Sequence, residues 1–292
     1  MTYTTSTQLS QADGLPLTTY AWEEVRELRG VVQLAHGLAE HAGRYDRLAR
    51  VLNAAGYLGY AHDHRGHGAT GSGSDSLGSF GAAGWDGLVA DVAAVGRSLA
   101  DRHPGLPVFL LGHSMGSFAA QQAILDHSDV WSGVVLSGTT ALDLLVQAMA
   151  GAGGEASGDL SAFNAGFEHR TGFEWLSRDA AEVDAYVADP WCGFEASPDA
   201  MAQMFGAASR LADPDALATI RRDLPLLIVS GEADPLAGGG ALVQAVGQRY
   251  SEAGISDVSV QLFSQARHEI FNEINRDEIT ALVVDWLDAH TP

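Results

Sequence analysis

Residues 108–116 read Val-Phe-Leu-Leu-Gly-His-Ser-Met-Gly, and this stretch decides the fold. The apolar run Val108–Leu111 predicts a buried strand, and the pattern Gly-x-Ser-x-Gly follows it directly. The next residues, Met115–Leu125, predict a helix. A serine on the sharp turn between a strand and a helix holds its hydroxyl exposed at the strand end. We therefore predict that Ser114 is a nucleophile and that the helix presents the Met115 N–H beside it.

Short apolar runs alternate with amphipathic stretches on both sides of this turn. Continuous apolar strands that are followed by helices predict a mainly parallel sheet with helices on both faces, an α/β fold. We expect strands at Gly30–Ala35, Tyr57–Ala61, Gly133–Leu136, Leu224–Val229 and Val258–Phe263, and helices at Tyr45–Ala55, Leu88–Ala100 and Asp277–Ala289.

The stretch between Thr139 and Asp223 breaks this alternation, because it contains no convincing strand. It opens with a helical pattern at Ala141–Ala150 and continues through a glycine-rich segment, Gly151–Gly158, which we expect to be flexible. We predict that residues 140–223 form a helical cap insertion. The α/β core would then consist of residues 1–139 and residues 224–292.

A serine hydroxyl needs a base and an orienting acid, and in this fold they follow the serine as acid and then histidine. Asp234 comes just after a predicted strand, at the sheet edge that also holds the serine, with Glu232 as the alternative acid. His268 follows the last strand, whereas His290 lies two residues from the chain end and is expected to fray. The order predicts Asp234 as the acid and His268 as the base.

An oxyanion needs a second backbone donor, which comes from the loop after an early strand. The strand Gly30–Ala35 leads into His36-Gly37-Leu38, so we predict that the Leu38 N–H and the Met115 N–H form an oxyanion hole. His36 is expected to be a turn residue that bonds to its own loop.

Histidines also cluster in the segment His62-Asp63-His64-Arg65-Gly66-His67-Gly68. A metal site is one interpretation, but the spacing matches no established ligand pattern, and a polar loop near the active-site edge is the preferred one. The single cysteine, Cys192, excludes an intrachain disulfide and a cysteine-cluster zinc site, and we expect a buried thiol. We therefore expect no metal.

The 292-residue chain carries 16 lysine and arginine residues against 37 aspartate and glutamate residues, a formal net charge of −21. This balance and the scattered basic residues exclude a nucleic-acid footprint and disfavour an anionic membrane surface. No apolar run approaches the ~20 residues of a membrane span, and Met1–Tyr20 has no signal-peptide pattern. We expect a soluble, cytoplasmic protein of undetermined oligomeric state.

Three motifs together resemble a known family. Residues 36–45 (HGLAEHAGRY), residues 61–68 (AHDHRGHG) and residues 112–116 (GHSMG) look like the monoacylglycerol lipase and lysophospholipase branch of the α/β-hydrolases. Residues 175–179, 183–186, 189–190, 231–234 and 267–269 are similar to the same branch. The resemblance implies an α/β-hydrolase fold, a triad at Ser114, Asp234 and His268, and oxyanion donors at Leu38 and Met115.

The sequence departs from the family at two places. Ser117 stands where many relatives carry glycine, and the Gly/Ala-rich segment 139–172, where lipid-contacting cap helices are expected, has no clear counterpart. This segment bears on the substrate rather than on the chemistry.

The predicted function is that of a serine carboxylic ester hydrolase that needs no cofactor. Its substrate would be a monoacylglycerol-like, lysophospholipid-like or other small monoester with an apolar acyl group. The alternatives are a thioesterase, an amidase or a cofactor-free peroxidase on the same triad, a non-catalytic ligand-binding protein, or a metal-dependent hydrolase. An apolar acyl pocket would draw on the cap residues Phe163, Phe167, Phe173, Trp175, Trp191, Phe194 and Met204, although about half of these are expected only to pack the cap onto the sheet.

Overall fold

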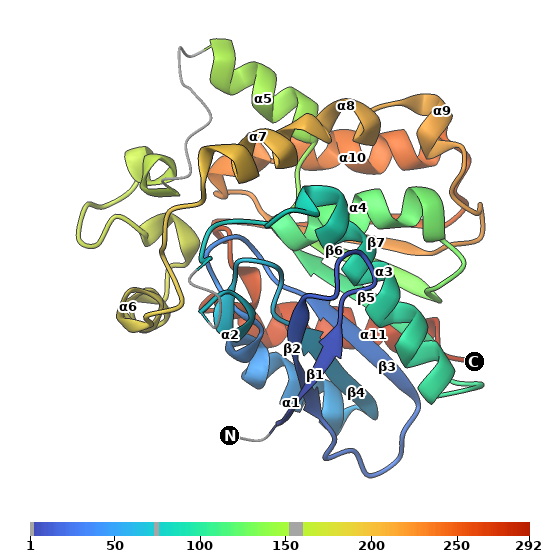
Figure 1. Ribbon diagram of the computed structural model, residues 1–292. Coiled ribbons are helices and arrows are strands. Elements are labelled where there is room, and N and C mark those ends of the chain that lie inside the picture. Colours follow the sequence, from blue (N-terminus) through green and yellow to red (C-terminus); the bar gives the residue numbers. More distant parts are fainter. Residues whose placement is uncertain (1–2, 73–75, 152–159) are drawn as a thin grey trace.

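The computed structural model describes residues 3–72, 76–151 and 160–292 (Figure 1). It is built around one central sheet. Its eight strands lie in the order β1-β2-β4-β3-β5-β6-β7-β8. They are β1 (Thr4–Leu9), β2 (Pro16–Trp22), β3 (Gly30–Ala35), β4 (Tyr57–His62), β5 (Val108–His113), β6 (Gly133–Ser137), β7 (Leu226–Gly231) and β8 (Val258–Phe263). Only the pairs β1–β2 and β2–β4 are antiparallel, so the predicted mainly parallel sheet is confirmed.

Helices cover both faces of the sheet, as predicted. On one face α1 (Asp46–Ala54) and α11 (Arg276–Ala289) enclose one apolar core. On the other face α3 (Gly84–Arg102), α4 (Met115–His127) and α10 (Ala241–Glu252) enclose a larger one. Strands β3, β5, β6 and β7 send side chains alternately into the two cores, which explains why most of their residues are apolar on both faces.

Two strands and one long helix were not expected from the sequence. The segment Thr4–Leu9 is almost wholly exposed and hydroxyl-rich, so it lacks the apolar alternation that marks a strand. Its pairing with β2 is supported by backbone register and by a 2.7 Å hydrogen bond between the Ser6 and Thr19 hydroxyls. Helix α10 has few buried residues and follows three consecutive glycines, Gly238–Gly240, which obscured it.

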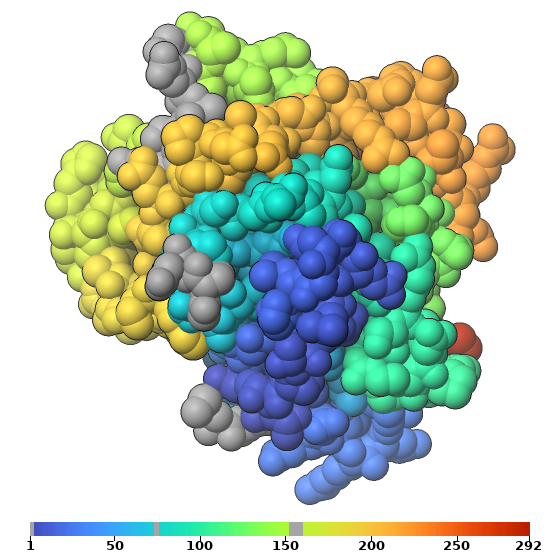
Figure 2. All heavy atoms as spheres, in the orientation of Figure 1, coloured from blue at the N-terminus to red at the C-terminus, as the bar shows by residue number. Residues whose placement is uncertain are grey.

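The segment predicted as a cap joins β6 to β7. It contains α5 (Leu142–Gly151), η2 (Leu160–Gly166), η3 (Glu174–Leu176), α6 (Ala180–Ala188), α7 (Pro198–Gly206), α8 (Ala208–Leu211) and α9 (Pro214–Leu217). Within its described residues no strand occurs, and residues 152–159, which include most of the segment expected to be flexible, lie outside the described part of the chain. Figure 2 shows these helices, yellow-green to orange, covering the top and left of the molecule in this view.

The prediction that His290 frays is wrong. Its ring makes hydrogen bonds to the Trp286 carbonyl at 2.7 Å and to the Asp257 carboxylate at 3.0 Å, and it packs against the Trp286 indole at 4.4 Å. The last turn of α11 is therefore bonded to Asp257, just before β8, which the position of His290 near the chain end did not reveal. None of the described helices has the length and apolar character needed to cross a bilayer.

A buried arginine ties the N-terminal hairpin to the core. The Arg65 side chain, 1% exposed, donates to the Asp91 carboxylate on α3 at 2.7 Å. It also donates to Asp13 at 2.6 Å and to the Ser10 hydroxyl at 2.5 Å, both at the turn between β1 and β2. Arg65 thus neutralises a buried carboxylate and fixes the hairpin with one guanidinium.

We expect the substitution Arg65→Ala to lower the free energy of unfolding by about 3–5 kcal/mol, because it leaves the buried Asp91 carboxylate without its cation. Thermal unfolding measures the loss as a lower Tm. Arg210→Ala is the matched control, since it breaks a solvent-exposed ion pair with Asp126, and its Tm should change far less. Equal losses in the two variants would contradict this assignment.

Candidate active site

Ser114 lies on the turn between β5 and α4, in a backbone conformation that only close packing sustains. Its φ and ψ are 52° and −120°, a region that costs a non-glycine residue about 1–3 kcal/mol. A Cβ atom on Gly116 would lie 2.1 Å from the Ala35 carbonyl oxygen, so α4 starts in contact with the end of β3. This approach forces the sharp turn that the Gly-x-Ser-x-Gly pattern predicts.

Asp234 and His268 meet at the carboxyl edge of the same sheet. Asp234 follows β7 and caps the turn η4 (Pro235–Ala237), where one carboxylate oxygen accepts the Leu236 N–H at 2.9 Å. Its other oxygen accepts a 2.8 Å hydrogen bond from His268 Nδ1, and both side chains are buried. The alternative acid, Glu232, is exposed, so the structure brings Asp234 to the imidazole instead.

The surroundings of His268 act on its pKa in opposite directions. Burial favours the neutral imidazole, whereas the hydrogen-bonded Asp234 carboxylate and the Glu269 carboxylate favour the cation. The carboxylates prevail and raise the pKa of His268 above its ordinary value. The ring accordingly has the proton affinity expected of a base.

Ser114 and His268 line the same cavity. The Ser114 hydroxyl makes no hydrogen bond with the His268 ring in this structure; hydrogen bonds between catalytic groups often tighten only when substrate binds. The remaining wall is mostly apolar and comes mainly from α4 and from the segment between β6 and β7, with Leu38 and Leu236 beside them. The cavity therefore joins a polar end at the sheet edge to an apolar chamber under the helices.

The expectation that seven cap side chains could line this cavity is correct for three of them. Phe163, Trp175 and Met204 do so. The other four pack elsewhere: Phe167 lies under Arg267, Phe173 against Tyr186, Trp191 against His41 and Phe194 against His67. Aromatic content in the sequence indicates burial but not which surface the ring meets.

Methionine is concentrated at the cavity. Met115, Met149, Met201 and Met204 all line it. The chain has five methionines, and the fifth, Met1, lies outside the described residues. Because methionine side chains are unbranched and adjust their shape, much of the wall can adapt to what it holds.

The loop after β3 lies directly against Ser114. A Cβ atom on Gly37 would lie 3.2 Å from the Ser114 Cβ. Within the described ranges, neither the Leu38 N–H nor the Met115 N–H donates a hydrogen bond to a protein atom. The interpretation of His36 as a turn residue is confirmed, because its Nδ1 bonds to the Gly37 carbonyl at 2.8 Å and its Nε2 accepts the His64 N–H at 2.9 Å.

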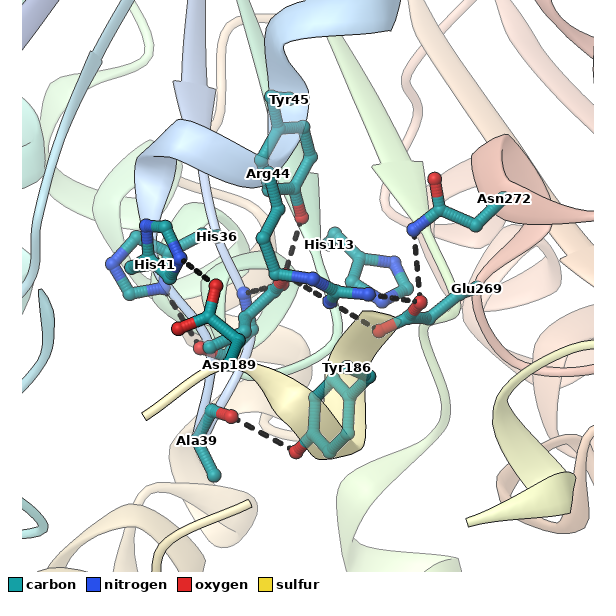
Figure 3. A network of polar contacts seen from close by, with 12 residues as sticks. His36, Ala39, His41, Arg44, Tyr45, His113, Tyr186, Asp189, Glu269 and Asn272 are labelled. Carbon is teal, nitrogen blue, oxygen red and sulfur yellow. Dashed lines mark hydrogen bonds and ion pairs between the residues drawn. The ribbon is translucent and has the colours of Figure 1, made fainter. Parts of the chain in front are cut away.

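A buried ionic network, which the sequence analysis missed, lies beside these loops (Figure 3). Arg44 donates to both oxygens of Glu269 at 2.5 and 2.7 Å and to Glu40 at 2.7 Å. Glu40 also accepts the Gly37 N–H at 2.5 Å and the Tyr45 hydroxyl at 2.8 Å. The network joins the loop that contains Leu38 to the residue that follows His268.

The two carboxyl groups of this network have different pKa values. Burial alone would raise both, but Arg44 pairs with Glu269 through two hydrogen bonds and brings its pKa to about 2. Burial dominates at Glu40, and the nearby Glu269 charge adds to it, so its pKa is raised. The motifs at residues 36–45 and 267–269 contained these residues, and the adjacency of Glu269 to His268 and the Glu-x-x-x-Arg spacing at residues 40–44 were the signals that could have assigned them a role.

The histidine cluster after β4 is buried rather than arranged as a set of metal ligands. Among the described residues, both ring nitrogens of His62 and of His64 have no hydrogen-bond partner. Burial lowers the pKa of His62 and of His67 to about 4, which keeps these rings neutral. The cluster therefore contributes neutral rings to the core beneath the loop of His36.

Across the described ranges, the one group of three metal-ligand types with atoms within 4.8 Å of one another is His41, Asp189 and Cys192. His41 Nδ1 accepts the Gly43 N–H, so its Nε2 carries the proton and donates to Asp189 at 2.9 Å. The Cys192 thiol is only partly buried, and desolvation raises its pKa. This donor set fits a hydrogen-bonded contact between loops better than a metal.

Comparison with known proteins places these residues in context. The family described as "Serine aminopeptidase, S33" matches residues 26–275. The chain is 32% identical over 286 residues to a monoacylglycerol lipase of Mycolicibacterium smegmatis, covering 95% of this chain and 94% of the relative. It is 29% identical over 279 residues to the monoglyceride lipase of Homo sapiens, covering 91% and 84% of the two chains.

Solved structures share the fold. A thermostable carboxyl esterase from Bacillus coagulans, determined in complex with glycerol, superposes over the whole of both chains with a TM-score of 0.86 and 26% identity. A monoglyceride lipase from Saccharomyces cerevisiae superposes over 100% of this chain and 97% of its own with a TM-score of 0.79 and 21% identity. The sheet and helices are therefore those of an α/β-hydrolase.

The conformation of Ser114 predicts a difference between two substitutions that both remove its hydroxyl. Ser114→Gly should unfold at a higher Tm than Ser114→Ala, because glycine accepts a positive φ without the strain of about 1–3 kcal/mol. That relief exceeds the about 0.5–1 kcal/mol that glycine costs through the unfolded chain. Thermal unfolding of the two purified variants measures the difference, and an equal or lower Tm for Ser114→Gly would show that the turn is not strained.

Proposed function

The chain belongs to the serine aminopeptidase S33 family of α/β-hydrolases and is a carboxylic ester hydrolase, and on this premise we propose that it cleaves small monoesters through Ser114, His268 and Asp234. One observation carries the proposal. The buried His268–Asp234 pair opens into the cavity that also holds Ser114 on its strained turn.

The proposed reaction has two halves. His268 Nε2 takes the proton from the Ser114 hydroxyl as its oxygen attacks the ester carbonyl, and the same proton then passes to the leaving alcohol. Water enters, gives a proton to His268, and attacks the acyl-enzyme to release the acid and restore Ser114. Asp234 holds the ring through Nδ1 and stabilises the imidazolium that forms in each half.

We propose that the Leu38 and Met115 amides stabilise the negative charge that develops on the carbonyl oxygen. Both lie beside Ser114, and both lack a protein partner in the described part of the chain. Donors that are fixed before the reaction lose no energy in reorganising, so they favour the tetrahedral state over the ester. The Glu40 carboxylate supports this arrangement by accepting the Gly37 N–H.

The substrate we propose is a neutral monoester with an apolar acyl chain, of the monoacylglycerol kind. The mostly apolar cavity suits such a chain, and the relatives named monoacylglycerol lipase and monoglyceride lipase span most of this sequence. The net charge of −21 disfavours anionic esters. Residues 140–223 act in this proposal as a cap that supplies the acyl wall, while residues 1–139 and 224–292 supply the chemistry.

Hydrolysis of a p-nitrophenyl ester series from acetate to palmitate tests the proposal. We expect turnover by the native protein with an optimum at a medium or long acyl chain, because the apolar chamber gains contacts as the chain lengthens. Ser114→Ala should lower kcat by a factor of about 10⁴ or more. A short-chain optimum would indicate a general esterase instead of a lipase.

Chelator treatment is the control for the alternative of a metal-dependent hydrolase, and activity should survive it. Thioester and amide substrates of the same acyl length separate the other uses of a serine triad. Full ester turnover by Ser114→Ala would refute the serine mechanism. If the folded native protein turned over thioesters but no oxygen esters, thioesters would replace oxygen esters as the proposed substrate class.

The pKa of His268 fixes the direction of the pH dependence. The base must be neutral, so kcat/KM should fall as the pH drops through a pKa that lies above the ordinary histidine value of about 6.5. Asp234→Asn removes the charge that favours the cation, so the titration should move to lower pH while the rate falls. NMR titration of the imidazole in both proteins measures the shift, and an unchanged or higher pKa in Asp234→Asn would contradict the assignment.

A further inference from the structure

The residue after Leu38 has an unfavourable backbone conformation. Ala39 has a φ of 54° and is fully buried. The left-handed region costs a residue with a Cβ roughly 1–2 kcal/mol, so Ala39 keeps this conformation only if neighbouring groups hold it there. Because φ at Ala39 sets the path of the loop, it also sets where the Leu38 N–H points.

The restraint on Ala39 comes from the segment between β6 and β7. The Ala39 carbonyl oxygen accepts a hydrogen bond from the Tyr186 hydroxyl at 2.9 Å (Figure 3). It also accepts one from the Gly193 N–H at 3.0 Å. Tyr186 belongs to α6, and Gly193 follows it after a short turn. Both donors are thus far from Ala39 in sequence and belong to the proposed cap.

The tyrosine ring is itself held on two sides. The Arg44 guanidinium lies 4.8 Å from its centroid, and the Phe173 ring packs at 5.1 Å. Next to it the Asp189 carboxylate accepts a hydrogen bond from His41, two residues beyond Ala39. The hydroxyl of Tyr186 therefore has a fixed position from which to hold the carbonyl.

The same segment also holds the loop of the base. The His268 N–H donates to the Trp175 carbonyl at 3.3 Å, and the Glu269 N–H donates to the Leu176 carbonyl at 2.7 Å. Helical residues of the cap thus bond to the backbone on both sides of Ser114, at Ala39 and at His268.

We propose that Tyr186 is a positioning residue, which holds the strained Ala39 carbonyl and so keeps the Leu38 N–H aimed at the developing oxyanion. This inference rests on the proposed function, in which Leu38 is an oxyanion donor. Docking of α6 on the loop would then complete the oxyanion hole, so the cap would set the rate of the reaction as well as the choice of substrate.

The test is a cycle of two substitutions, each measured with p-nitrophenyl acetate, whose acyl group is too short to need the apolar chamber. Tyr186→Phe removes the hydroxyl and keeps the ring. We expect it to lower kcat about three- to tenfold, the value of one lost hydrogen bond, with KM within twofold of the native value. Affinity for a boronic acid that forms a tetrahedral adduct on Ser114 should fall by the same factor.

The second substitution, Ala39→Gly, removes the strain, because glycine adopts a positive φ freely. In the Ala39→Gly background the hydrogen bond from the Gly193 N–H is enough to hold the loop. Tyr186→Phe should therefore lower kcat less than twofold in this background. Tyr186 also lines the cavity, and a loss caused by substrate contact or cap packing would be the same in both backgrounds. Equal losses would therefore overturn the proposal, as would no loss in the native background.

Tyr57→Phe is the matched control. It removes another tyrosine hydroxyl, which bonds to Asp288 and Thr291 at the opposite end of the sheet. Its Tm should fall while kcat stays unchanged, whereas a fall in kcat would show that lost stability alone slows the reaction. Ser114→Ala in the same assay distinguishes failure of the proposed function from failure of this inference. Full activity of Ser114→Ala would refute the proposed function. An inactive Ser114→Ala together with an unaffected Tyr186→Phe would refute only the role of Tyr186.

Discussion

The closeness of α4 to the end of β3 is the constraint on which the site depends. No methyl group fits between Gly116 and the Ala35 carbonyl, so strand, turn and helix have one way to connect. That connection puts Ser114 in a strained conformation and places the Met115 amide at the helix start, and the loop after β3 lies against the serine. Backbone packing therefore brings together the proposed nucleophile, the Met115 amide and the loop that contains Leu38.

Electrostatics then joins the parts that packing brings together. Arg44 is a single buried cation between two carboxylates, one on the loop of Leu38 and one beside His268. Removing Arg44 would leave two buried carboxylates without their cation, which makes independent movement of the two loops costly. The proposed base and oxyanion hole are thereby coupled through charge as well as through the sheet.

The sequence predicted most of the sheet and the residues of the proposed site, for one physical reason. Parallel strands end at a common edge, so chain order alone placed Ser114, Asp234 and His268 together. It did not predict β1, whose exposed hydroxylated residues lack apolar alternation, or the pairing of Arg44 with Glu269, which are 225 residues apart. Nor could it tell that Phe173 packs against Tyr186 instead of lining the cavity, because composition marks burial without naming the neighbour.

The concentration of methionine at the cavity has a chemical consequence. Thioethers are oxidised to sulfoxides, which are polar and chiral where the parent side chain is apolar. Since Met115, Met149, Met201 and Met204 all line one chamber, oxidation anywhere among the described methionines would alter the same surface. The adaptable shape of this wall, which would suit the proposed acyl chains, thus comes with a concentrated vulnerability to oxidants.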